Sequence, residues 1–133
     1  MKSFSELSID DDIKSALEQL KFETPTKIQS AAIPPLLAGK DLIACAETGS
    51  GKTAAYGLPL LVKIIENPKS CGLILAPTRE LAQQISDFLK ELTRFKKNFQ
   101  ITLLVGGQDI RKQFRQLQKK SKISTNRYRF KVF

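Results

Sequence analysis

The residues best suited to chemistry lie in one short stretch, AETGSGKT, at positions 46–53. Its two glycines let the backbone bend so that successive N–H groups point inward at an anion, and a helix N-terminus behind them adds partial positive charge. In such a loop Lys52 reaches phosphate oxygens and Thr53 offers its hydroxyl to Mg²⁺. The pattern therefore predicts a phosphate-binding loop made of Ala46, Glu47, Thr48, Gly49, Ser50, Gly51, Lys52 and Thr53.

The segments around this loop favour that interpretation over a glycine turn with a chance lysine. The apolar run at 41–46 is typical of a buried strand, and a helix is expected over 52–66, kinked or restarted at Pro59. Two more buried strands are expected at 71–76 and 100–105. Apolar strands that alternate with helices predict an α/β fold, with a parallel sheet and helices on both of its faces.

Four other helices are expected from apolar spacing and from capping residues. The first covers 9–20 behind Ser8, and the second starts at Thr26 and ends or kinks at the two prolines 34–35. The third follows Thr78 and the fourth follows Asp109. The apolar stripes from Leu81 to Leu92 and from Ile110 to Leu117 are interpreted as core faces without a function of their own.

Composition limits the class of protein. A chain of 133 residues is one domain at most, and it has no histidine, which excludes Ser-His and Cys-His catalysis within it. Cys45 and Cys71 lie in apolar runs and are expected to be reduced core residues of a cytosolic protein. We find no signal peptide and no apolar run long enough to span a membrane, so a cytoplasmic location without membrane contact is expected.

Charge is concentrated at the C-terminal end. Residues 94–133 carry 12 lysines and arginines against a single acidic residue, Asp109. Such a surplus indicates either a polyanionic partner or an abnormal tail.

Five features follow one another along the chain: Phe4, KFETPTKIQ at 21–29, AETGSGKT at 46–53, PTREL at 77–81 and the glycines at 106–107. In their order and rough spacing they resemble the DEAD-box ATP-dependent RNA helicases over about residues 1–118, and KFETPTKIQ resembles the Q motif of that family. The resemblance implies a partial P-loop RecA-like domain with three of its strands. It also implies ATP and Mg²⁺ as cofactors and RNA as the partner.

The resemblance also implies a role for each motif residue in adenine recognition. Phe22 would pack against the adenine, Thr24 and Pro25 would shape the pocket, and Gln29 would form paired hydrogen bonds with the adenine edge. Lys21 stands where the family usually has glycine. A second interpretation of Gln29 needs no nucleotide, because Thr26 and Gln29 have the spacing of a capping box.

On the RNA side, the resemblance implies backbone contacts from Pro77, Thr78, Arg79, Gly106 and Gly107. Contacts of this kind hold the sugar-phosphate chain without reading its bases. The alternatives are a surface ion pair of Arg79 with Glu80 or Asp87, and a plain turn at the two glycines.

The family pattern stops after residue 118. No acidic DEAD-type box follows, and this box would hold Mg²⁺ and orient the attacking water, so we expect no ATP hydrolysis and no unwinding by this chain alone. Residues 119–133 form a divergent basic tail, for which a frameshift is the preferred interpretation. Its weak alternation of Tyr128, Phe130 and Val132 with basic residues also fits a strand, or stacking on single-stranded nucleic acid.

Three interpretations of the whole chain remain open. The leading one is the N-terminal part of a DEAD-box helicase that binds ATP-Mg²⁺ and RNA. The second is a non-catalytic basic module that binds RNA or a protein partner. The third is a non-functional gene fragment with an open sheet edge.

Overall fold

The computed structural model describes residues 1–119 and 123–127. The chain divides into two compact units, Met1–Asn67 and Pro68–Phe133, which are described one at a time. The mixture of helices and parallel strands confirms the predicted α/β class.

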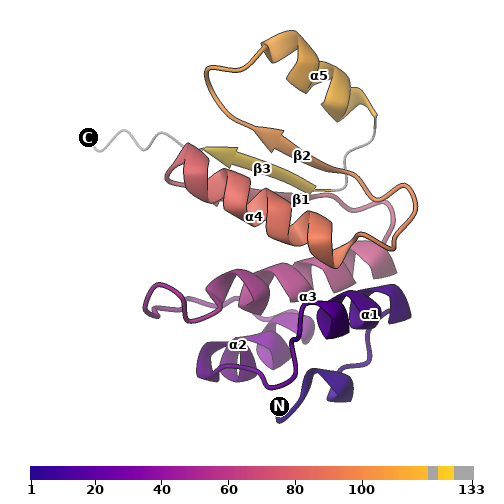
Figure 1. Ribbon diagram of the computed structural model, residues 1–133, viewed down its shortest axis with the longest axis vertical. Coiled ribbons are helices and arrows are strands. Elements are labelled where there is room, and N and C mark those ends of the chain that lie inside the picture. Colours follow the sequence, from indigo (N-terminus) through magenta and orange to yellow (C-terminus); the bar gives the residue numbers. More distant parts are fainter. Residues whose placement is uncertain (120–122, 128–133) are drawn as a thin grey trace. The chain divides into compact units, whose positions relative to one another are not determined.

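The first unit is helical (Figure 1). It contains a short 3₁₀ helix, η1 (Phe4–Glu6), followed by α1 (Asp11–Gln19), α2 (Lys27–Leu37) and α3 (Lys52–Glu66). Helices α2 and α3 pack against each other. Its core side chains are almost completely buried and include Ile13, Leu17, Ile33, Leu58 and Leu61.

The prolines end neither α2 nor α3, so of the break or kink that their positions predict, the break does not occur. Helix α2 continues through Pro34 and Pro35, and the expectation that it ends there is wrong. Proline lacks the N–H donor, but its carbonyl still accepts: Ala38 N donates to Pro34 O at 3.0 Å and Lys40 N to Pro35 O at 3.0 Å. Helix α3 likewise runs as one element across Pro59.

Helix α1 starts later than its apolar pattern predicts. Asp10, and not Ser8, is the N-cap, because its carboxylate accepts a hydrogen bond from Asp12 N at 3.1 Å. An aspartate is as good an N-cap as a serine, so the sequence alone did not separate the two.

The strand predicted at 41–46 does not form. These residues lie in the first unit without regular pairing, and the side chains of Leu42 and Ile43 are 42% and 98% exposed. A strand needs a neighbour that supplies ladder hydrogen bonds, and an apolar run does not by itself provide one.

The second unit holds the sheet. Its elements are β1 (Gly72–Ala76), α4 (Arg79–Leu92), β2 (Ile101–Leu104), α5 (Ile110–Gln118) and β3 (Ile123–Arg127). The strand order is β1-β3-β2 and both pairs are parallel. The third strand therefore comes from residues 123–127, within the predicted tail, and not from 41–46.

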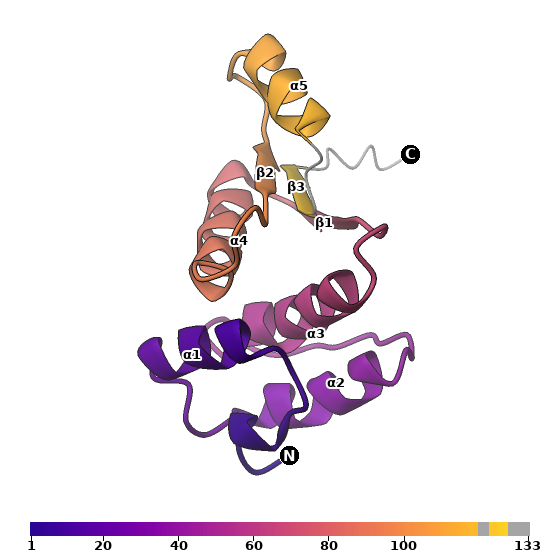
Figure 2. The ribbon, with the colours of Figure 1, turned by 90° about the vertical axis from the view of Figure 1, so that its right-hand side faces the viewer.

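Helix α4 carries the core of this unit. It runs alongside the sheet in both ribbon views and contacts all three strands (Figures 1 and 2). Thr78 caps it by accepting a hydrogen bond from Leu81 N at 3.1 Å, as predicted. The predicted apolar stripe is largely buried, with Ile85, Leu89 and Leu92 at its centre.

Helix α5 departs from its prediction. Asp109 caps it as expected and accepts a hydrogen bond from Arg111 N at 2.8 Å. Its apolar stripe is not a core face, however: Ile110 is 64% exposed and Phe114 is 58% exposed. Amphipathic spacing indicates that a helix has an apolar face, but it does not supply the surface that would cover it.

Two other expectations concern the cysteines and the C-terminal residues. Cys45 and Cys71 are free and exposed, so their assignment to the core is wrong. The alternation predicted for Tyr128, Phe130 and Val132 lies outside the described residues. No helix in the described part of the chain is long and apolar enough to cross a membrane.

The contrast between α4 and α5 gives a prediction about stability. Leu89→Ala should lower the free energy of unfolding by about 2–5 kcal/mol, because it opens a cavity at a side chain that is 0% exposed. Phe114→Ala should change it by less than about 0.5 kcal/mol. Urea unfolding followed by circular dichroism measures both; equal losses would mean that α5 is packed as tightly as α4.

Candidate functional site

The AETGSGKT loop has the backbone bends that its glycines predict. Gly49 and Gly51 have φ angles of +81° and +89°, in the left-handed region that other residues rarely adopt. Gly51 is also the N-cap of α3, and as a glycine it offers no side chain to cap that helix end. Within the described residues, the first N–H groups of α3 therefore border the loop without a capping side chain, as an anion site requires.

Lys52 points back into its own loop. Its ammonium group donates hydrogen bonds to the backbone carbonyl oxygens of Ala46 and Glu47. The positive charge is thus held over the loop by two uncharged acceptors. A phosphate oxygen would be a stronger partner for this ammonium group than either carbonyl.

Gln29 connects the start of α2 to the loop. Its Oε1 accepts a hydrogen bond from Thr26 N at 2.9 Å, and its Nε2 donates to Gly51 O at 3.2 Å. The Thr26 hydroxyl accepts from Gln29 N at 3.4 Å and donates to Ser50 O at 2.8 Å. The capping box is present, and its two side chains also hold the loop through the carbonyls of Ser50 and Gly51.

This contact explains why position 51 must be glycine. A Cβ atom built on Gly51 would lie 2.4 Å from Gln29 Nε2, far closer than van der Waals contact allows. At Gly49 nothing lies within 4 Å of such an atom. The backbone of the loop therefore approaches α2 closely at residue 51 and is open to one side at residue 49.

The donors of the loop fit a phosphate chain with its metal ion. Ser50 Oγ is buried and has no hydrogen-bond partner in the described part of the chain, which leaves a polar atom inside the loop to be satisfied. Lys52 supplies a positive charge, and the Thr53 hydroxyl supplies an oxygen of the kind that Mg²⁺ prefers.

Tyr56 is the partner of Thr53. Burial raises the pKa of the Tyr56 hydroxyl, and a side-chain hydrogen bond with Thr53 partly offsets that rise. A hydroxyl has one donor and two acceptor lone pairs, so Thr53 retains an acceptor for a metal ion while it bonds Tyr56. Tyr56 was missed in the sequence, where its only signal is a position one helical turn after Thr53.

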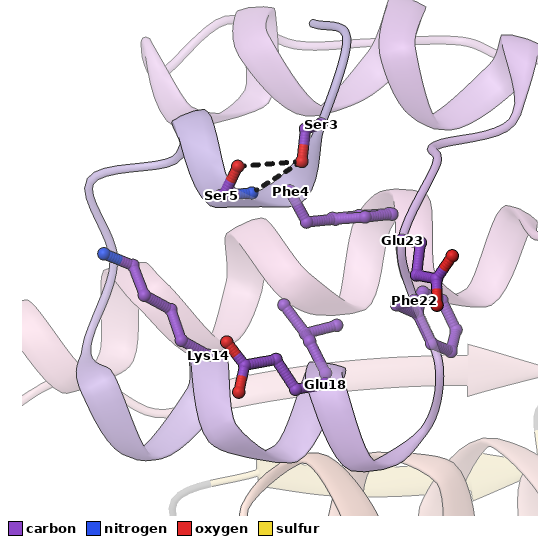
Figure 3. Close-up of a pocket in the computed structure, with 8 residues that line it drawn as sticks. Ser3, Phe4, Ser5, Lys14, Glu18, Phe22 and Glu23 are labelled. Carbon is purple, nitrogen blue, oxygen red and sulfur yellow. Dashed lines mark hydrogen bonds between the residues drawn. The ribbon is translucent and has the colours of Figure 1, made fainter.

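Phe22, which is expected to pack against the adenine, lies beside Phe4 in a pocket that Gln29 does not line. The Phe4 and Phe22 rings meet edge to face, with centroids 5.6 Å apart and an interplanar angle of 72°. They border a cavity of about 450 Å³ that also takes in Lys14, Glu18 and Glu23 (Figure 3). Thr24, which is exposed, and Pro25, which is half-buried, do not line it, and neither does Gln29.

The second unit brings together three of the residues expected to contact RNA: Arg79, Gly106 and Gly107. Arg79 opens α4, and its guanidinium lies against the Gly106–Gly107 turn: a Cβ atom built on Gly107 would lie 2.8 Å from Arg79 Nη1. Gly107 has a φ of +84°. Within the described residues Arg79 forms no ion pair with Glu80 or Asp87. A surface hollow of about 280 Å³ lies between Arg79, Gln83 and the turn.

Pro77 and Thr78, the other two residues expected to contact RNA, lie outside this hollow. Both are exposed and neither lines it. The Thr78 hydroxyl caps α4 by accepting a hydrogen bond from Leu81 N.

The chain is similar to known proteins of one family. A family model described as DEAD/DEAH box helicase matches residues 26–130. The ATP-dependent rRNA helicase rrp3 of Aspergillus fumigatus is 50% identical over 123 residues, which are 92% of this chain and 26% of the relative. The DEAD-box ATP-dependent RNA helicase CshA of Bacillus cereus is 45% identical over 120 residues, which are 90% of this chain and 23% of the relative.

Solved structures give the same result. The crystal structure of a DEAD box protein from the hyperthermophile Methanococcus jannaschii has a TM-score of 0.86 and 38% identity, over 96% of this chain and 35% of that one. The RNA helicase Prp28 from Chaetomium thermophilum, bound to ADP, has a TM-score of 0.84 and 38% identity, over 96% of this chain and 32% of that one. These neighbours confirm the RecA-like fold.

The two loop glycines form a matched pair for a stability prediction. Gly49→Ala and Gly51→Ala both place a Cβ at positive φ, which costs about 1–2 kcal/mol. Gly51→Ala should cost more, because its methyl group also displaces the Gln29 amide. Urea unfolding should therefore rank wild type above Gly49→Ala and Gly49→Ala above Gly51→Ala. Equal stabilities for the two variants would contradict the contact between Gln29 and the loop.

Proposed function

Because the chain belongs to the DEAD/DEAH box helicase family, we propose that its first unit binds ATP with Mg²⁺ and its second unit binds the backbone of RNA. The chain spans 26% and 23% of the two curated relatives described above. In the proposal, the whole protein couples ATP binding and hydrolysis to the separation of RNA strands, and this chain supplies part of both binding surfaces.

The observation that carries the ATP part is the Gln29 bridge. One side-chain amide is fixed between the start of α2 and the carbonyl of Gly51. Each atom of that amide keeps capacity for a further bond, since Oε1 has a second lone pair and Nε2 a second hydrogen. Those free positions match the donor and acceptor on the edge of adenine. Gln29 would then contact the base while it holds the loop that contacts the phosphates.

In this proposal Lys52 exchanges partners. Its ammonium group leaves the carbonyl oxygens of Ala46 and Glu47 and turns to the β- and γ-phosphates, while Thr53 contributes to holding Mg²⁺. The N–H groups at the start of α3 supply the remaining donors. The bound metal supplies charge neutralisation and orientation of the phosphates.

We further propose that this chain alone binds ATP without hydrolysing it. Hydrolysis in P-loop enzymes needs a carboxylate for the metal and a residue that orients water. Residues 1–133 contain no DEAD-type acidic box that would supply these two groups, and the loop's own acid, Glu47, is exposed.

The RNA part rests on Arg79 and the glycine turn. A guanidinium beside exposed backbone N–H groups is suited to a phosphodiester, because both are donors and neither reads a base. The hollow beside them is lined by Arg79 and Gln83 and has Glu80 as its acidic residue. Binding should therefore be independent of RNA sequence.

A non-catalytic RNA-binding module is the second candidate, and helix α5 favours it. This helix exposes the Phe114 ring together with the basic side chains of Arg111, Lys112 and Arg115. Basic residues beside an exposed aromatic ring suit single-stranded RNA through charge and stacking. This candidate requires no ATP. It would be favoured if the wild-type protein did not bind ATP and if substitutions in α5 abolished RNA binding.

Lys52→Ala tests the ATP site. Isothermal titration with ATP and Mg²⁺ should show affinity reduced about ten- to a hundredfold, because a charge-assisted hydrogen bond to phosphate is lost. The matched control is Lys63→Ala, which removes an exposed lysine from the same helix and should leave the heats unchanged. Identical titrations for wild type and Lys52→Ala would overturn the ATP proposal.

Arg79→Gln tests the RNA site. Its affinity for single-stranded RNA should fall by a similar factor for every sequence, and the slope of log K against log salt should decrease by about 0.7. Arg94→Gln is the control. It removes the same charge two residues after the C-terminal end of α4, from an exposed ion pair with Glu91 in which Nη1 and Oε2 are 3.4 Å apart. If Arg94→Gln reduced both quantities equally, the contact would be diffuse and the assignment to Arg79 wrong.

A further inference from the structure

We infer that Gln113 is a positioning residue that holds the Gly106–Gly107 turn in place for the RNA backbone. The inference rests on the proposed RNA contact of Arg79 and the turn. It concerns a side chain on α5 that belongs to none of the motifs found in the sequence.

The Gln113 amide bonds to the backbone on both sides of the turn. Its Oε1 accepts from Val105 N at 3.0 Å, and its Nε2 donates to Val105 O at 3.1 Å. Nε2 also lies 3.5 Å from Gln108 O, at the limit of a hydrogen bond. Residues 105 and 108 flank the two glycines, so one side chain joins both ends of the turn.

The peptide groups of Val105 need hydrogen-bond partners from outside the strand. Val105 directly follows the last residue of β2 and is 7% exposed, so its peptide groups are poorly solvated. The Gln113 amide pairs with both of them, as a neighbouring strand would. This fixes the direction in which the chain leaves the sheet and enters the turn.

The hydrogen bonds of Gln113 to Val105 and Gln108 also limit how the turn can move relative to Arg79. Gly107 has a φ of +84°, and its backbone lies so close to the guanidinium that a Cβ there would be 2.8 Å from Nη1. A turn of two glycines is flexible when its ends are free. With residues 105 and 108 tied to Gln113, the turn and Arg79 keep one relative geometry before RNA arrives, which lowers the entropy lost on binding.

Supporting α5 does not account for these contacts. Asp109 already caps the helix by accepting from Arg111 N at 2.8 Å. In addition, none of the α5 side chains is buried, so Gln113 does not serve a packed helix face. What its amide reaches is the backbone on either side of the glycines.

The test is Gln113→Met, which keeps the length of the side chain and removes both the donor and the acceptor. Binding of a single-stranded oligouridylate is measured by fluorescence anisotropy, well below the melting temperature of each variant. Affinity should fall about three- to tenfold, the effect of losing one or two hydrogen bonds that orient a contact. The control is Gln118→Met, an exposed glutamine of the same helix, which should bind as wild type does.

A double-mutant cycle with Arg79→Gln separates positioning from general destabilisation. If Gln113 acts through the turn and Arg79, then Gln113→Met should have little further effect once Arg79 is replaced. Full additivity of the two losses would overturn the inference. So would unchanged binding by Gln113→Met in a protein whose binding does depend on Arg79, and this result would leave the proposed function standing.

Two further outcomes would also overturn the inference. If wild type fails to bind the oligouridylate, the proposed RNA contact and the inference fall together. If Gln113→Met melts below the assay temperature, Gln113→Asn is the second variant, because its shorter amide should lose the same contacts. If both variants are unfolded, Gln113 is required for folding itself, and the inference is overturned.

Discussion

The side-chain amide of Gln29 is the contact on which the candidate ATP site depends. It accepts a hydrogen bond from the backbone N–H of Thr26 and donates one to the carbonyl of Gly51, so it fixes the phosphate loop to the start of α2. The close approach excludes any side chain at residue 51, and Gly51 in turn begins α3, the helix that presents Lys52. A change at Gln29 would therefore reach the loop, the helix start and the lysine together, although Gln29 lies 22 residues before the glycine that it contacts.

The second unit uses the same kind of contact at another glycine turn. Gln113 pairs with both peptide groups of Val105, as Gln29 pairs with one group of Thr26 and one of Gly51. A primary amide suits this task because it carries a donor and an acceptor side by side and no charge, so it can be buried against backbone at little desolvation cost. In both units the glycines provide the bend, and a glutamine from a helix selects one conformation of that bend.

Local features of the fold were predictable from the sequence, and features that depend on distant partners were not. Thr26, Thr78 and Asp109 were recognised as caps because a cap is defined by residues within one helical turn. The left-handed backbone at Gly49 and Gly51 was predictable for the same reason, because it depends on the residue type at each position. The strand expected at 41–46, the burial of Cys45 and Cys71, and the core face of α5 all depend on what lies opposite, and there the apolar pattern gave wrong answers. For the site, the sequence named Gln29 and Arg79 but missed Gln113, because a glutamine on a helix has no pattern that indicates backbone contact.

Strand β3 is a partner distant in sequence that determines the geometry of the candidate RNA site. It lies between β1 and β2, where Ala76 pairs with Arg127 and Leu104 pairs with Asn126. Arg79 follows the end of β1 and the glycine turn follows the end of β2, and parallel strands bring their carboxyl ends to the same edge of a sheet. The spacing between these two parts of the candidate RNA site is therefore set by a strand that contains neither of them. Residues 123–127 belong to the segment whose composition indicated a divergent tail, yet their backbone is what places Arg79 beside the turn.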